Sequence, residues 1–130
     1  MNRAAAAAAE IENEFSFLDD WEDRYQLLID LGRQLPPLPE IYHKDEYQLR
    51  GCQSVVHFAA ERDGDEIRFH AGSDAAIVQG LIALLIRVYS QRTADEILST
   101  NAQFLAETTM RQSWMLRMKT VRLTRLANGW

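Results

Sequence analysis

The one cysteine of the chain, Cys52, is the residue best suited to covalent chemistry. It lies in Arg50-Gly51-Cys52-Gln53-Ser54, just before a stretch that is predicted to be a β-strand. Gly51 can adopt backbone angles closed to other residues, so it can present the thiol at a loop tip. Arg50 favours the reactive thiolate if its side chain turns towards the sulfur. The pattern predicts a nucleophilic thiol, although a free cysteine is as often a small buried apolar side chain.

Other uses of this thiol fit the sequence less well. A protease-type nucleophile needs a histidine base, but two of the three histidines, His57 and His70, fall on predicted strands opposite the apolar side chains. No Cys-x-x-Cys or His-x-x-x-His spacing predicts a metal site, and one thiolate is too few for an iron–sulfur cluster within one chain. We therefore expect the chain to bind no metal and no cofactor of its own.

A β-hairpin is predicted directly after the cysteine. Apolar residues alternate on either side of Asp63-Gly64, namely Val56, Phe58 and Ala60 and then Ile67, Phe69 and Ala71. Such alternation gives each strand one apolar face, and Asp-Gly is a strong signal for the tight turn between them. One or two short strands beside the hairpin would complete a small sheet, and Leu49-Arg50 is a candidate.

Two long helices are predicted, one on each side of the hairpin. Apolar residues at three- and four-residue steps predict the first from about Glu10 to Arg33. Pro36, Pro37 and Pro39 then end it. The second covers about Ala75–Tyr89 and is apolar on nearly every face, which indicates a helix buried against the sheet.

The helix ends carry local signals as well. Gly72-Ser73-Asp74 offers an N-cap to the second long helix, and Thr93-Ala94-Asp95-Glu96 offers one to the next. Short helices are expected over Ala94–Leu98 and Ala102–Thr108. A last helix, about Arg111–Ala127, has no single apolar stripe.

The composition fits one compact α+β domain over residues 1–130. Of 130 residues, 47% are hydrophobic and 25% charged, which suffices for a single core. The order of elements predicts a small antiparallel sheet of about three strands with helices on one face. Residues 1–12, which include Ala4–Ala9, are expected to be a frayed helical lead-in rather than a signal peptide, because acidic residues follow the alanines at once.

Charge and cysteine content suggest the partners and the compartment. The net charge of -5 disfavours nucleic acid as the main partner. The residues after Glu107 nevertheless form a basic tail of Arg111, Arg117, Lys119, Arg122 and Arg125. A lone thiol suits a reducing compartment, and no apolar stretch is long enough to span a bilayer. We expect a cytoplasmic protein that binds neither membrane nor nucleic acid.

Three segments resemble the SufE family of sulfur-transfer proteins. The first runs from Trp21-Glu22-Asp23-Arg24-Tyr25 to Leu35-Pro36, the second is Gly51-Cys52-Gln53-Ser54-Val55-Val56, and the third runs from Ser73-Asp74 through Gly80-Leu81 to Ile97-Leu98. They occur in order and at natural spacing, and they cover about Glu14 to Leu105. His57 stands where family members commonly carry tryptophan, and residues 111–118 replace the family's Ser/Thr-Pro-x-Arg-x-Asn-Gly segment.

The resemblance implies a fold shared with the IscU-like iron–sulfur scaffold proteins and a role as sulfur carrier rather than stand-alone enzyme. A SufS- or CsdA-like cysteine desulfurase, which holds the pyridoxal phosphate, would pass a persulfide sulfur to Cys52 and be stimulated by the acceptor. The sulfur would then go to an iron–sulfur scaffold complex. Asp74 matches the start of the helix beside the acceptor loop, where it helps to hold the loop. Arg117 is the candidate for the family arginine.

Two further hypotheses remain open from the sequence. The chain could be a non-catalytic docking or regulatory module that binds a desulfurase without accepting sulfur. It could also bind nucleic acid through its basic tail, which would make binding strongly salt-dependent.

Overall fold

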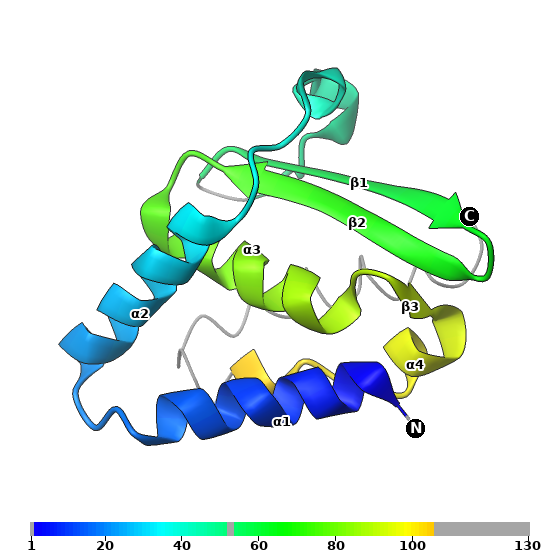
Figure 1. The fold of residues 1–130 in the computed structure, drawn as a ribbon. Coiled ribbons are helices and arrows are strands. Elements are labelled where there is room, and N and C mark those ends of the chain that lie inside the picture. The colour runs from blue at the N-terminus through cyan, green and yellow to red at the C-terminus, as the bar shows by residue number, and fades with distance from the viewer. Residues whose placement is uncertain (1, 52–53, 106–130) are drawn as a thin grey trace.

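A three-stranded antiparallel sheet with helices on one face forms the fold (Figure 1). The computed structural model describes residues 2–51 and 54–105. In chain order the elements are α1 (Arg3–Ser16), α2 (Trp21–Gln34), the 3-10 turns η1 (Glu40–Tyr42) and η2 (Asp45–Tyr47), β1 (Val56–Asp63), β2 (Glu66–Ser73), α3 (Ala76–Tyr89), β3 (Arg92–Thr93) and α4 (Ala94–Leu98). The predicted α+β class is confirmed. The expected helix over Arg111–Ala127 lies outside the described residues, as do residues 106–108 of the one expected over Ala102–Thr108, whose residues 103–105 are helical.

The predicted hairpin with its turn at Asp63-Gly64 is confirmed. Strand β1 pairs antiparallel with β2, so that Phe58 lies opposite Ala71 and Ala60 opposite Phe69. The chain reverses at Gly64, whose φ of 64° is one that glycine adopts without steric cost. The apolar face of the hairpin therefore turns towards the helices.

The third strand differs from the prediction. It is β3, which pairs with Glu66 and Ile67 at the start of β2. The expected strand at Leu49-Arg50 is wrong, because only Gln48 forms an isolated bridge, to His57, before the chain turns at Arg50 and Gly51. A two-residue strand is too short to produce an alternating sequence pattern.

Helix α3 lies at the centre of the fold, as its all-round apolar sequence predicts. Figure 1 shows it between the sheet and α1, with α2 crossing it at one end. The expected N-cap within 72–74 is wrong: the N-cap residue is Ala75, which has no side-chain cap. Ser73 still contributes locally, because its Oγ accepts the Ala75 N–H at 3.2 Å.

The predicted helix from Glu10 to Arg33 is two helices, with a break over residues 17–20. Asp20 causes the restart, since its carboxylate accepts the Glu22 N–H at 3.0 Å as an N-cap. Glu22 and Asp23 follow in the first turn, where the helix dipole favours negative charge. Helix α2 ends at Gln34, just before the prolines, as expected.

The expectation of a frayed lead-in over residues 1–12 is wrong, because α1 belongs to the main core. Ala4 and Ile11 are both 0% exposed, and Asn2 caps the helix by accepting the Ala4 N–H at 2.9 Å. Arg87 on α3 forms an ion pair with Glu14 and a longer one with Glu10. Alanines allow α1 to approach α3 closely, and this packing overrides the weak amphipathic signal of the segment.

Acid should weaken the attachment of α1 to α4. The pKa of Glu96 lies well below its usual range, because its carboxylate accepts hydrogen bonds from the Arg3 side chain and from the Arg3 and Thr93 N–H groups. Its stabilising effect is therefore complete above the ordinary value of 4.5 and is lost as the pH falls towards the lowered pKa. We expect Glu96→Gln to lower Tm by a few degrees near neutral pH and by less at about pH 2. An equal Tm difference at both pH values would contradict this.

No helix within residues 2–51 and 54–105 is a candidate for spanning a membrane. None of them combines the length and the apolar character that crossing a bilayer requires.

Candidate functional site

The loop that carries Cys52 is held at its base by a backbone hydrogen bond. The Leu49 N–H donates to the Val56 carbonyl at 2.8 Å, which closes residues 50–55 into a loop. Gly51 has a φ of 85°, so the predicted need for glycine there is met. Cys52 and Gln53 lie outside the described residues.

Five buried side chains support this base, and we call them the loop frame: Leu49, Val56, Ala71, Val78 and Ile82. They come from the residue before the loop, both hairpin strands and α3. Leu49 and Val56 are 9% and 1% exposed, so both ends of the loop are anchored in apolar packing. A close-packed support of this kind fixes where the loop starts and returns.

Three other predicted site residues are described, namely Arg50, Ser54 and Asp74, and they lie at the same end of the sheet. Val56 pairs with Ser73, so Asp74, the next residue, follows the strand end beside the base of the loop. Arg50 and Asp74 are exposed, whereas Ser54 is half-buried. The structure therefore places Asp74 next to the loop base by chain register, while its predicted role in holding the loop stays a prediction. Arg117 lies outside the described residues.

Aromatic and histidine side chains cover the outer face of the hairpin, away from the helices. Tyr42 stacks on His70, with ring centroids 4.9 Å apart and an interplanar angle of 21°. Desolvation is the main cause of the raised pKa of Tyr42. The Nε2 atom of His70 lies 2.8 Å from Oε1 of Glu61. The prediction that His57 and His70 lie opposite the apolar face is confirmed by the strand register.

Sequence analysis missed the packing of residues 40–48 on the outer face of the hairpin. The stretch from Ile41 to Gln48 has no helical or alternating apolar pattern, yet the 3-10 turns η1 and η2 lie against β1. The His43 and His57 rings have centroids 5.6 Å apart, and His57 is five residues after Cys52. Tyr42 and Tyr47 are the one sequence signal for this packing, since aromatic residues in a surface loop usually find a contact.

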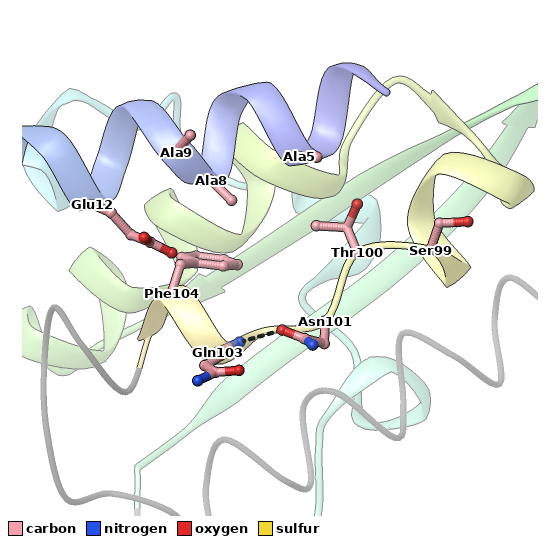
Figure 2. Close-up of a pocket in the computed structure, with 9 residues that line it drawn as sticks. All are labelled: Ala5, Ala8, Ala9, Glu12, Ser99, Thr100, Asn101, Gln103 and Phe104. Carbon is pink, nitrogen blue, oxygen red and sulfur yellow. Dashed lines mark hydrogen bonds between the residues drawn. The ribbon is translucent and has the colours of Figure 1, made fainter. Parts of the chain in front are cut away.

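Two of the cavities on the described part of the chain lie away from the ends of the cysteine loop. Figure 2 shows the larger, of about 450 Å³, between α1 and residues 99–104. Its polar lining includes Glu12, Ser99 and Gln103, and Ala8 and Phe104 also face it. The smaller, of about 360 Å³, lies along β2.

The described residues contain no candidate metal site. No group of three or more histidine, cysteine, aspartate or glutamate side chains comes together there to hold an ion.

Comparison with known proteins places the chain among SufE sequences. Residues 9–121 match the SufE family, described as "Fe-S metabolism associated domain". An uncharacterized SufE-like protein of Rhizobium meliloti (strain 1021) is 39% identical over 97 residues, covering 72% of this chain and 69% of that protein. Another from Rhizobium etli is 41% identical over 101 residues, covering 75% and 68%. The solution structure of a hypothetical protein from Thermus thermophilus has the same fold, with a TM-score of 0.68, 18% identity and coverage of 94% and 93%.

Proposed function

The chain belongs to the SufE family of domains associated with Fe–S metabolism, and on that premise we propose that Cys52 accepts a persulfide sulfur from a cysteine desulfurase. The acceptor stimulates the desulfurase by emptying its persulfide, and it passes the sulfur on to an iron–sulfur scaffold complex. A SufS- or CsdA-like enzyme is the expected donor, in the reducing cytoplasm. The pyridoxal phosphate that generates the persulfide stays on that enzyme.

The transfer is an exchange between two sulfur atoms. The Cys52 thiolate attacks the terminal sulfur of the donor persulfide, the donor S–S bond breaks, and a new S–S bond forms on Cys52. The donor cysteine leaves as a thiolate, so no external oxidant or reductant is needed. The exposed Arg50 guanidinium, two residues from the thiol, favours the thiolate form if it turns towards the sulfur.

The observation that best supports this proposal is the closed loop on its rigid frame. The hydrogen bond between Leu49 and Val56 fixes both ends of a six-residue loop on buried side chains. Functional residues commonly lie on loops positioned by such a scaffold. A thiol at that place can enter a partner's active site while the fold stays intact.

Intact-protein mass spectrometry tests the proposal. The chain is incubated with a SufS-type desulfurase and free cysteine, with Cys52→Ser and Ser99→Ala as variants. We expect the wild type and Ser99→Ala to gain the mass of whole sulfur atoms and to lose it when reductant is added. Cys52→Ser should gain none, because the chain has no other cysteine.

The alternative, a docking module, gives a different result in the same experiment. The protein would bind the desulfurase and change its turnover without gaining sulfur, and Cys52→Ser would act like the wild type. That outcome would overturn the sulfur-carrier function and leave a regulatory one.

A further inference from the structure

One edge of β2 is only partly covered in the described part of the chain. Strand β3 pairs with Glu66 and Ile67 alone. Three contacts show which residues turn their backbone groups away from β1. The Ile67 carbonyl accepts the Gln91 N–H at 2.8 Å, the Phe69 N–H donates to Ser90 Oγ at 3.0 Å, and the Ser73 N–H donates to Gln79 Oε1 at 2.8 Å. Every second residue of β2 therefore faces this edge.

Ala71 belongs to the same alternating set, so its N–H and C=O also point away from β1. Within residues 2–51 and 54–105, neither group of Ala71 has a hydrogen-bond partner, and the Phe69 carbonyl has none either. Phe69 and Ala71 are only 4% and 5% exposed. Buried backbone groups without partners are unfavourable, so this edge is suited to receive a donor and an acceptor from another chain.

The smaller cavity, which we call the edge groove, opens over these groups. Residues 68–71 line it consecutively. Since strand side chains alternate between faces, only a cavity at the edge can touch four in a row. The segment 35–39, which contains three prolines, forms one wall, and Ile86, Ser90 and Gln91 also line the groove. Proline restricts the backbone, so this wall needs little ordering when a ligand binds.

The charges around the edge groove favour an acidic ligand. Arg68 and His70 are the charged or titratable residues of its lining, which contains no acid. Each has one acidic neighbour beyond the lining, Asp63 at 3.4 Å from Arg68 and Glu61 at 2.8 Å from His70. The Nε atom of Arg68 is nevertheless buried without a partner in the described part, so one donor of this guanidinium is left over.

We propose that the edge groove binds an extended acidic segment of the cysteine desulfurase, which adds to β2 in line with β3. This inference rests on the proposed function. A backbone carbonyl of the guest accepts the Ala71 N–H, a backbone N–H of the guest donates to the Phe69 carbonyl, and a carboxylate pairs with Arg68. Strand addition of this kind takes affinity from the main chain and specificity from the side chains beside it.

The desulfurase is the favoured occupant because the edge groove and the cysteine loop share one core. Three residues that line the edge groove take part in that core. Ala71 belongs to the loop frame, and Leu35 and Ile86 pack against it. A segment bound in the edge groove therefore contacts the side chains that carry Leu49 and Val56.

Amide hydrogen exchange on Cys52→Ser protein, with and without a SufS-type desulfurase, tests the proposal. We expect the Ala71 amide to exchange at least about tenfold more slowly in the complex. The neighbouring His70 amide should change little, because its residue lies in a hydrogen-bonded pair with Ala59 on β1. Residue-level mass spectrometry separates the two positions.

Charge-reversal variants give an independent readout. Arg68→Glu should weaken desulfurase binding about tenfold or more, whereas Arg62→Glu, exposed on the other strand, should bind like the parent protein. Circular dichroism checks that both variants fold. Binding without slower exchange at Ala71, and with Arg68→Glu unaffected, would overturn the edge groove but leave the sulfur-carrier function standing. No binding of either the wild type or the Cys52→Ser protein to the desulfurase would overturn both.

Discussion

Replacing Gly80 by alanine is expected to lower the free energy of unfolding by about 3 kcal/mol or more. A Cβ at this position would lie 2.3 Å from the Leu28 carbonyl oxygen and 2.7 Å from its carbon. These are backbone atoms of α2, which cannot turn aside as a side chain can. The helices α2 and α3 would have to separate where they cross.

The reciprocal contact shows that the crossing depends on both helices. A Cβ on Gly32 would lie 2.8 Å from the Gly80 nitrogen, so the two glycines bring the backbones together. Intrinsic helix propensity favours alanine over glycine by about 1 kcal/mol. The steric penalty must therefore exceed this gain in helix propensity before Gly80→Ala can lower the stability. A loss of stability is thus evidence that the two backbones lie in close contact.

Thermal and urea unfolding measure this effect, with Gly72→Ala as the matched control. A Cβ on Gly72 would meet only the Leu38 side chain, at 3.3 Å, and the end of the Gln79 side chain, at 3.8 Å, so its effect should stay within about 1 kcal/mol. For Gly80→Ala we expect Tm to fall by roughly 10 °C or more. A Gly80→Ala protein as stable as the parent would show that α2 and α3 do not approach this closely.

The second large effect is expected at the end of α1, where Phe15→Ala should cost about 3–5 kcal/mol. The Phe15 side chain is 1% exposed and belongs to the main core with Ile11 and Phe104. Its removal leaves a cavity that the surrounding helices can fill only in part.

Phe17→Ala is the control, because it removes the same side chain two residues later. Phe17 is 76% exposed, so this change should alter the stability by less than about 0.5 kcal/mol. Chemical denaturation of the two variants gives the comparison directly. Equal effects would contradict the docking of α1 on the core.

The elements that sequence analysis predicted best carry their signals locally. Alternation and Asp63-Gly64 lie within the hairpin itself, and its register follows from them. The limits of α4 were predicted correctly because Thr93 and Glu96 form a capping box within four residues. The course of α3 was predicted because no exposed helix tolerates so apolar a surface.

What sequence analysis missed depends on contacts between distant residues. Alanine gives the start of α1 no marked apolar stripe, and the contacts that order it come from Glu96 and Thr100. The two-residue strand β3 forms only because Ser90 and Gln91 bring it beside β2.

At the site, the sequence located the cysteine and its loop but not what supports them. Gly51 and the following strand were enough to predict a loop there. Ala71, Val78 and Ile82 join the loop frame through the packing of α3 on the sheet. The stacking of Tyr42 on His70 is likewise a tertiary contact, which no local pattern specifies.

The contacts between α1 and α4 also set the order in which the chain can fold during synthesis. Asn2 donates to Thr100 Oγ1 at 3.0 Å, and Arg3 pairs with Glu96. Helix α1 is made before α4, and it must therefore wait for almost the last described residues before it gains these partners. Contacts so far apart in sequence slow folding, and the apolar face of α1 stays uncovered meanwhile. Until Phe104 has been made, Ile11 and Phe15 lack part of the core that buries them, and a nascent chain with such uncovered apolar side chains is prone to aggregate.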